Sequence, residues 1–126
     1  MDAIASLKNY RQAPRKVRLV ADLVRGKRAE HALALLSMLP KRASDPMAKL
    51  IKSAIANAQN LNEGSAAADL VISKIEVNGG IVFKRSMPRA RGRASAIKKK
   101  TSLITLTLTS MPHKAPKAKK VAAATN

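Results

Sequence analysis

The segment KRSMPRARGRASAIKKK, residues 84–100, restricts the fold more than any other feature of this 126-residue chain. It holds eight cationic side chains and no acid, so it belongs outside a hydrophobic core. Strand-like sequence stands on both sides of it. The chain from about Gly80 to Leu103 is therefore expected to leave the compact part of the fold, either as an extended hairpin or as a disordered loop.

The charge balance points to a polyanionic partner. A formal net charge of +18 comes from 25 Lys and Arg against 7 Asp and Glu, and residues 77–126 contain twelve cations and no acid. Self-repulsion on this scale favours nucleic acid first and an anionic membrane second. No apolar run approaches the roughly 20 residues of a membrane span, cysteine is absent, and the first residues do not resemble a signal peptide. A cytosolic protein, or one of an organelle matrix, fits these features best.

The length is that of one domain, expected over residues 1–110, with a flexible basic tail at 111–126. Apolar residues spaced at i, i+3, i+4 and i+7 predict three helices. Pro14 suits the start of the first and Gly26 the position after its end, and Pro40 ends the second. The three apolar faces comprise Val17, Val20, Ala21 and Val24; Ala32, Leu35, Leu36 and Leu39; and Met47, Leu50, Ile51, Ala54, Ile55 and Ala58.

Alternation of apolar and polar residues predicts two strands, LVISKIEV at 70–77 and TSLITLTLTS at 101–110. The NGG sequence at 78–80 marks a turn or a bulge, and the first ten residues allow a further strand. If the two strands pair as antiparallel neighbours, an excursion of about eleven residues per arm spans roughly 35 Å at 3.3 Å per residue. Such an arm is longer than the small domain that carries it.

Arginine dominates the centre of the charged segment. Arg89, Arg91 and Arg93 alternate with small residues, so in an extended conformation the three guanidinium groups point the same way. Such a row fits a phosphate backbone, because arginine can grip phosphate bidentately. With one Tyr and one Phe in the chain, aromatic platforms for stacked bases are not expected. Recognition should rest on phosphates and on shape.

The sequence offers little material for catalysis. Its two histidines lie in unrelated contexts, so neither a His-metal cluster nor a Ser-His-Asp arrangement can be assembled, and there is no nucleotide-binding GxxxxGK[ST] or GxGxxG motif. Asp22, Glu30 and Glu76 are expected to pair with neighbouring Lys or Arg. Asn57, inside the third helix, is expected to form a structural hydrogen bond in preference to an RNA contact. We therefore expect no enzymatic activity, no metal and no cofactor.

Three motifs resemble the family of bacterial-type ribosomal large-subunit protein twenty-two: RKVRLVADLVRGK at 15–27, SAIANA at 53–58 and KRSMPRARGRASAIKKKTS at 84–102. The resemblance covers roughly residues 3–109 and implies an α+β fold, in which three helices pack on a small antiparallel sheet with a long protruding β-hairpin at about 80–103. It also implies a non-enzymatic structural constituent of the large ribosomal subunit. Such a protein binds ribosomal RNA, supports subunit assembly and lines the nascent-peptide exit tunnel with its hairpin.

The partners implied by the resemblance are large-subunit ribosomal RNA, neighbouring large-subunit proteins and the nascent polypeptide at the tunnel wall, with no membrane. The RNA contacts it implies are Arg15, Lys16, Arg18, Arg25, Lys27, Lys84, Arg85, Arg89, Arg91, Arg93, Lys98, Lys99 and Lys100. The tunnel-facing tip it implies consists of Phe83, Lys84, Arg85, Pro88 and Arg89. The family usually keeps its third helix continuous, and Pro46 is expected to interrupt it here. The residues themselves leave the start of that helix open: Asp45 and Pro46 suit a cap and a first helical position, and KRAS at 41–44 could add a turn.

A DNA-architectural protein is the alternative from a different class. Such proteins grip the minor groove with basic β-arms that carry a proline near the tip, and residues 88–93 suit that chemistry. They usually act as dimers, however, and the sequence shows no obvious surplus apolar face for one. A role at a membrane surface is less favoured, because no basic helix carries a large aromatic or leucine face.

Overall fold

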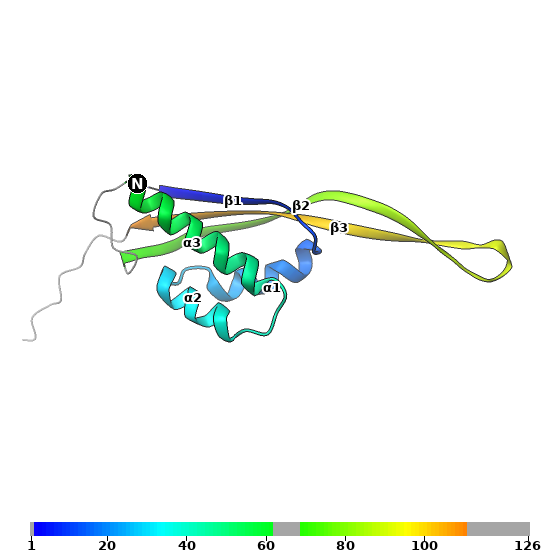
Figure 1. The fold of residues 1–126 in the computed structure, drawn as a ribbon, viewed down its shortest axis with the longest axis horizontal. Coiled ribbons are helices and arrows are strands. Elements are labelled where there is room, and N and C mark those ends of the chain that lie inside the picture. The colour runs from blue at the N-terminus through cyan, green and yellow to red at the C-terminus, as the bar shows by residue number, and fades with distance from the viewer. Residues whose placement is uncertain (1, 62–68, 111–126) are drawn as a thin grey trace, which may run out of the picture.

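The computed structural model describes residues 2–61 and 69–110. In this part of the chain the elements follow in the order β1 (Asp2–Tyr10), α1 (Pro14–Val24), α2 (Ala29–Met38), α3 (Ser44–Leu61), β2 (Leu70–Pro88), the short 3-10 turn η2 (Ala90–Gly92) and β3 (Ala94–Ser110). The helices gather at one end of an antiparallel sheet, and β2 and β3 continue past them as a long hairpin (Figure 1). The expected α+β fold is confirmed. The predicted tail, 111–126, lies outside the described residues.

The helices form where the apolar spacing predicts them. α1 begins at Pro14 and buries Val17, Val20, Ala21 and Val24 on one face. Gly26 follows with φ of +76°, a left-handed conformation that glycine adopts without steric cost. Its N–H and the carbonyl of the next residue both bond to Ile72, each at 3.0 Å, so the end of α1 is joined directly to β2.

The expected interruption of the third helix at Pro46 is wrong. α3 runs from Ser44 to Leu61, and Pro46 lies in its first turn. Proline is tolerated there because the first N–H groups of a helix have no intrahelical acceptor. The N–H of Met47 already donates to the carbonyl of Ala43 at 3.1 Å, so helical hydrogen bonding begins immediately after the proline.

The sheet has the order β1-β3-β2, with both pairs antiparallel. Its central strand is β3, whose Ile104, Leu106 and Leu108 are buried while the threonines between them are only partly covered. β1 buries Ala3 and Ala5, and α3 packs along it. The Asn57 amide donates to the carbonyl of Ile4 at 3.0 Å, which confirms the expected structural hydrogen bond and fixes α3 to the edge strand.

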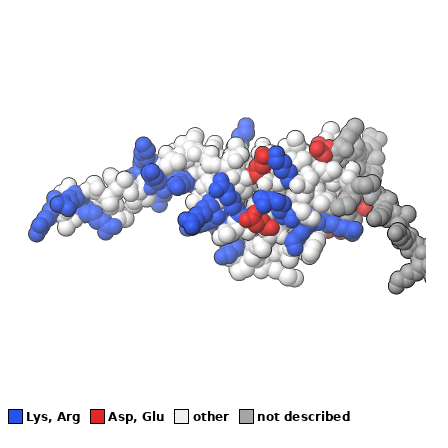
Figure 2. All heavy atoms as spheres, turned by 180° about the vertical axis from the view of Figure 1, so that it is seen from behind, with Lys and Arg blue, Asp and Glu red and all other residues white. Residues whose placement is uncertain are grey.

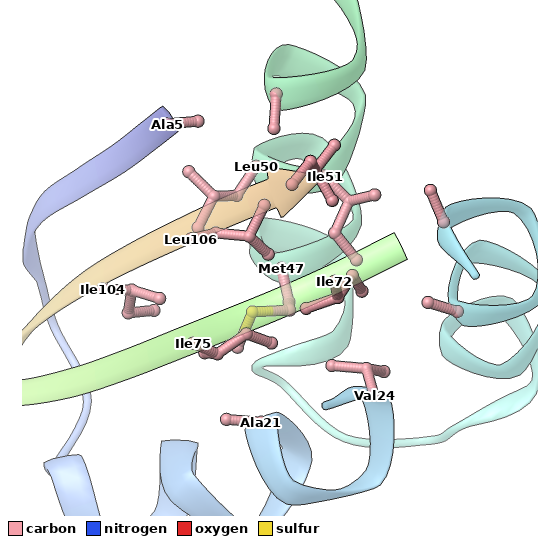
Figure 3. Packing of buried hydrophobic residues seen from close by; sticks show 14 of the residues in the cluster. Ala5, Ala21, Val24, Met47, Leu50, Ile51, Ile72, Ile75, Ile104 and Leu106 are labelled. Atoms are coloured by element: carbon pink, nitrogen blue, oxygen red, sulfur yellow. The ribbon is translucent and has the colours of Figure 1, made fainter. Parts of the chain in front are cut away.

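One hydrophobic core lies between the sheet and the helices. Met47 of α3 is fully buried beside Ile72 and Ile75 of β2, and Ile51 and Leu106 lie close by (Figure 3). α1 and α2 contribute mainly valine and alanine to the same cluster. Small side chains allow these helices to approach the strands closely, so a chain with few aromatic residues still fills its interior.

The core ends where the free hairpin begins. Val77 and Thr101 are buried, whereas every side chain from Asn78 to Pro88 is exposed except the half-buried Phe83. The register shifts between Gly79 and Val82, so the predicted NGG feature is a bulge. The nine residues from Gly80 to Pro88 then extend the arm by about 30 Å at 3.3 Å per residue. Of the two alternatives for the charged segment, the structure adopts the extended hairpin.

Candidate nucleic-acid interface

The register of the hairpin decides where its cations point. Directly opposite residues of an antiparallel pair project from the same face, and successive residues alternate between faces. Lys84 lies opposite Lys98, and Lys100 follows on the same face opposite Val82. The other face carries Lys99 opposite Phe83 and Arg85 opposite Ile97. Both faces of the ribbon are therefore basic, and Figure 2 shows its Lys and Arg side chains in groups at its end and nearer the globular part.

This arrangement is unfavourable for the isolated protein. Lys84 and Lys98 are both exposed and directly opposite, and like charges in that geometry destabilise a strand pair. A two-stranded ribbon is at best marginally stable in water even without such repulsion. Anions on both faces would remove the penalty, so the ribbon is suited to a polyanion that surrounds it.

The expectation that Arg89, Arg91 and Arg93 form a row on an extended strand is wrong. The strand pairing ends at Pro88 opposite Ala94, and the residues between them reverse the chain. Arg91 has φ of +59° and Gly92 φ of +68°, while the Arg89 N–H donates to the Arg93 carbonyl at 2.7 Å. A reversal this tight needs left-handed backbone, so the three guanidinium groups gather around the end of the hairpin instead of along one edge.

The residues predicted for the tip are spread along the free arm of the hairpin, from its turn down to Phe83 near its base. Pro88 is the last residue of β2, and Arg89 begins the turn, where its Nε donates to Ser95 Oγ at 3.3 Å. Phe83, Lys84 and Arg85 pair with Lys99, Lys98 and Ile97, nearer the globular part. Lys98, Lys99 and Lys100 lie on the returning strand beside them.

A second group of cations lies at the base of the hairpin. Arg15 and Lys16, in the first turn of α1, line a hollow of about 370 Å³ together with Lys100 and Gly79. Arg18 also borders this hollow, and its Nε and Nη2 donate to the Val77 carbonyl at 3.2 and 3.0 Å. The fold thus brings three predicted RNA-binding residues of α1 next to one from β3. The sequence separates them by more than eighty positions.

Arg25 and Lys27 are not part of this group. They follow the opposite end of α1, about 16 Å away at 1.5 Å per residue of an eleven-residue helix. Arg25 pairs with Asp22 at 2.6 Å and also donates to the Ile75 carbonyl at 3.3 Å. Lys27 is half-buried and lines an apolar hollow with Leu23, Leu35 and Leu39. Both side chains therefore have contacts within the protein.

Sequence reasoning missed Arg11 and Asn9. Arg11 follows β1 directly, and its guanidinium carbon lies 4.7 Å from the centroid of the Phe83 ring. Asn9 has φ of +55° at the bulge in β1, which turns the chain beside the same ring. No periodic signal marks either residue, because a contact between β1 and the outgoing arm of β2 exists only in the folded chain. The basic composition of residues 8–16 is the sequence feature that points to this region.

Two acidic side chains form ion pairs with nearby cations. Asp22 pairs with Arg25, and Glu76 pairs with Lys74 at 2.6 Å, as the sequence predicts for these two acids. Within residues 2–61 and 69–110, no three His, Cys, Asp or Glu side chains come together as a metal site. Over the same ranges no helix is long and apolar enough to cross a membrane.

Fold and surface together define a class: a small α+β domain that presents a basic β-hairpin, with a basic hollow at its base, to a polyanion.

Comparison with known proteins identifies the family within that class. Residues 5–109 match the family model described as ribosomal protein L22p/L17e. The chain is 52% identical over 106 residues to the large ribosomal subunit protein uL22 of Herpetosiphon aurantiacus, an alignment that covers 84% of this chain and 93% of that protein. It is 51% identical over 109 residues to uL22 of Oceanobacillus iheyensis, covering 86% and 96% of the two chains. This chain belongs to the L22p/L17e family of ribosomal proteins.

Proposed function

We propose that this protein is a structural, non-enzymatic constituent of the large ribosomal subunit, which binds ribosomal RNA and supports assembly of the subunit. Its relatives are named as large ribosomal subunit proteins, and they align over most of its length. Residues 1–110 act as one domain, and its place of action is the ribosome in the cytoplasm. Neighbouring large-subunit proteins are further partners.

The observation that carries this proposal is the two-sided charge of the hairpin. A ribbon that lies on a polyanionic surface needs cations on one face only, whereas Lys84 and Lys98 project from one face and Arg85 and Lys99 from the other. Folded ribosomal RNA offers phosphates on opposite sides of a narrow passage. Two strands are thin enough to thread between RNA segments, and each phosphate contact releases counterions from the RNA.

The end of the hairpin has a further role in this proposal. It projects about 30 Å past the globular part. We propose that the globular part stays at the surface of the subunit while the hairpin crosses the RNA and lines the nascent-peptide exit tunnel. Pro88 and Arg89, with the neighbouring turn, would then face the nascent polypeptide. The resemblance of residues 84–102 to the hairpin motif of the family supports this assignment.

Mapped crosslinking of the full chain to protein-free large-subunit ribosomal RNA tests the proposal. Crosslinks from residues 84–100 into several regions that are distant in the RNA sequence are expected. Equal affinity for duplex DNA, with scattered crosslinks, would instead indicate the DNA-architectural alternative.

Matched charge variants test the two-sided arrangement. Lys84→Gln with Lys98→Gln neutralises one face, and Arg85→Gln with Lys99→Gln neutralises the other. Each pair should reduce the slope of log K against log salt by roughly 1.4 to 1.8, because two phosphate contacts are lost. Lys49→Gln with Lys52→Gln removes the same charge from exposed positions on α3 and should change the slope less. If the protein instead bound any polyanion through its overall charge, all three variants should lose the same amount of this slope.

A further inference from the structure

Beside the base of the hairpin lies a hollow whose chemistry differs from that of the phosphate-binding surface. It has a volume of about 300 Å³ and is lined by Asn9, Arg11, Ile81, Phe83 and Thr101. β1 supplies Asn9 at its bulge, and the outgoing arm of β2 supplies Ile81 and Phe83. The hollow is therefore formed where the edge strand and the free hairpin diverge.

The lining combines a planar guanidinium and an aromatic ring with an apolar side chain and a polar amide. The guanidinium of Arg11 lies 4.7 Å from the Phe83 ring centroid, and that of Arg85 lies 5.7 Å from it. Ile81 is 60% exposed and supplies the apolar part of the lining. The Thr101 hydroxyl donates to the Ile81 carbonyl at 2.6 Å, so its one donor is already used within the protein. The exposed Asn9 amide supplies the polar edge of the hollow.

A phosphate would use the guanidinium groups but gain nothing from Ile81 and Phe83. An apolar side chain would use the ring but not the amide. A nucleobase uses the ring, the guanidinium groups and the amide. Its π-face stacks on an aromatic ring or a guanidinium plane, while its edge hydrogen-bonds to an amide. Bases inside an A-form helix are paired and their faces are covered, so the ligand has to be unpaired. The volume is at the lower end of the range for small-ligand pockets.

We infer that this hollow receives one unpaired nucleobase of the bound RNA, stacked on the pair that Arg11 and Phe83 form and hydrogen-bonded by Asn9. The inference rests on the proposed RNA-binding function and adds a base contact to an interface otherwise made of phosphate contacts. It also modifies the expectation that aromatic stacking plays no part, since a single ring is sufficient for a single base.

Chemical probing of protein-free large-subunit ribosomal RNA with the full chain tests the inference. Base-specific reagents for all four bases would be combined with hydroxyl-radical cleavage of the backbone. The wild-type protein should protect at least one unpaired base within its backbone footprint. Phe83→Leu keeps an apolar side chain without the ring, and it should re-expose that base while weakening binding about 5- to 100-fold. Asn9→Gly removes the amide but tolerates the positive φ, and it should re-expose the same base.

Lys98→Gln serves as the matched control, since it removes a cation from the hairpin without touching the hollow. It should weaken the whole footprint and, at saturating protein, leave the base protected. A backbone footprint without any protected base that depends on Phe83 and Asn9 would overturn the inference and leave the proposed function intact. The absence of any footprint would overturn both.

Discussion

Gly80 is the position where a single methyl group should disturb the base of the hairpin. A Cβ placed there would lie 2.6 Å from Thr101 Oγ1, closer than real Cβ contacts allow. The hydroxyl cannot simply rotate away, because Thr101 is 2% exposed, is β-branched and donates to the Ile81 carbonyl. Gly80→Ala therefore has to break this hydrogen bond or displace the bulge.

The expected cost of Gly80→Ala is about 1–3 kcal/mol in the free energy of unfolding, the range for forcing extra atoms against a well-packed side chain, here the buried Thr101. With a slope of about 2 kcal/mol per molar urea, the unfolding midpoint should fall by roughly 0.5 to 1.5 M. Far-UV circular dichroism during urea unfolding measures this shift. Gly79→Ala is the control, since a Cβ there meets nothing within 4 Å, and its midpoint should stay close to that of the wild type.

A double mutant examines the cause of the loss. Thr101→Ala should itself cost about 1 kcal/mol through the lost hydrogen bond. Because it also removes the obstructing oxygen, Gly80→Ala combined with Thr101→Ala should cost little more than Thr101→Ala alone. Additive losses, or equal midpoints for Gly80→Ala and Gly79→Ala, would refute the reasoning from close approach.

Three further predictions have defined outcomes. Met47→Ala should lower the free energy of unfolding by about 2–5 kcal/mol in urea titrations, because it leaves a cavity beneath the sheet; a loss under 1 kcal/mol would contradict the packing described. Arg18→Gln removes the guanidinium that holds the Val77 carbonyl, and thermal unfolding without RNA should show a loss of about 1 kcal/mol. The backbone amides of residues 84–100 should exchange hydrogen rapidly in the free protein and slowly on RNA, since an isolated, self-repelling ribbon is marginal; protection without RNA would oppose this.

The sequence predicts the structure correctly where a residue's neighbours in sequence are also its neighbours in space. The four buried residues of α1, from Val17 to Val24, follow directly from helical periodicity and from Pro14. Pro46 does not interrupt α3, because the effect of a proline depends on its distance from the helix start, and the sequence allows that start at 45–46 or within 41–44. The arginines at 89–93 were misread for a similar reason, since alternation describes a strand only if the chain does not turn there.

The features of the candidate sites can also be separated into those that the sequence shows and those that only the folded chain brings together. The positive charge of residues 84–100, the absence of acids after Glu76 and the family motif can be read from the sequence, and together they favour a polyanionic partner. Only the tertiary structure decides that Arg15 and Lys16 share a hollow with Lys100, that Arg11 stacks on Phe83, and that the cations of the hairpin point from both faces. Composition and periodicity act over a few residues, whereas strand register and bulges arise from pairing between distant segments, and a shift of one residue would exchange the two faces.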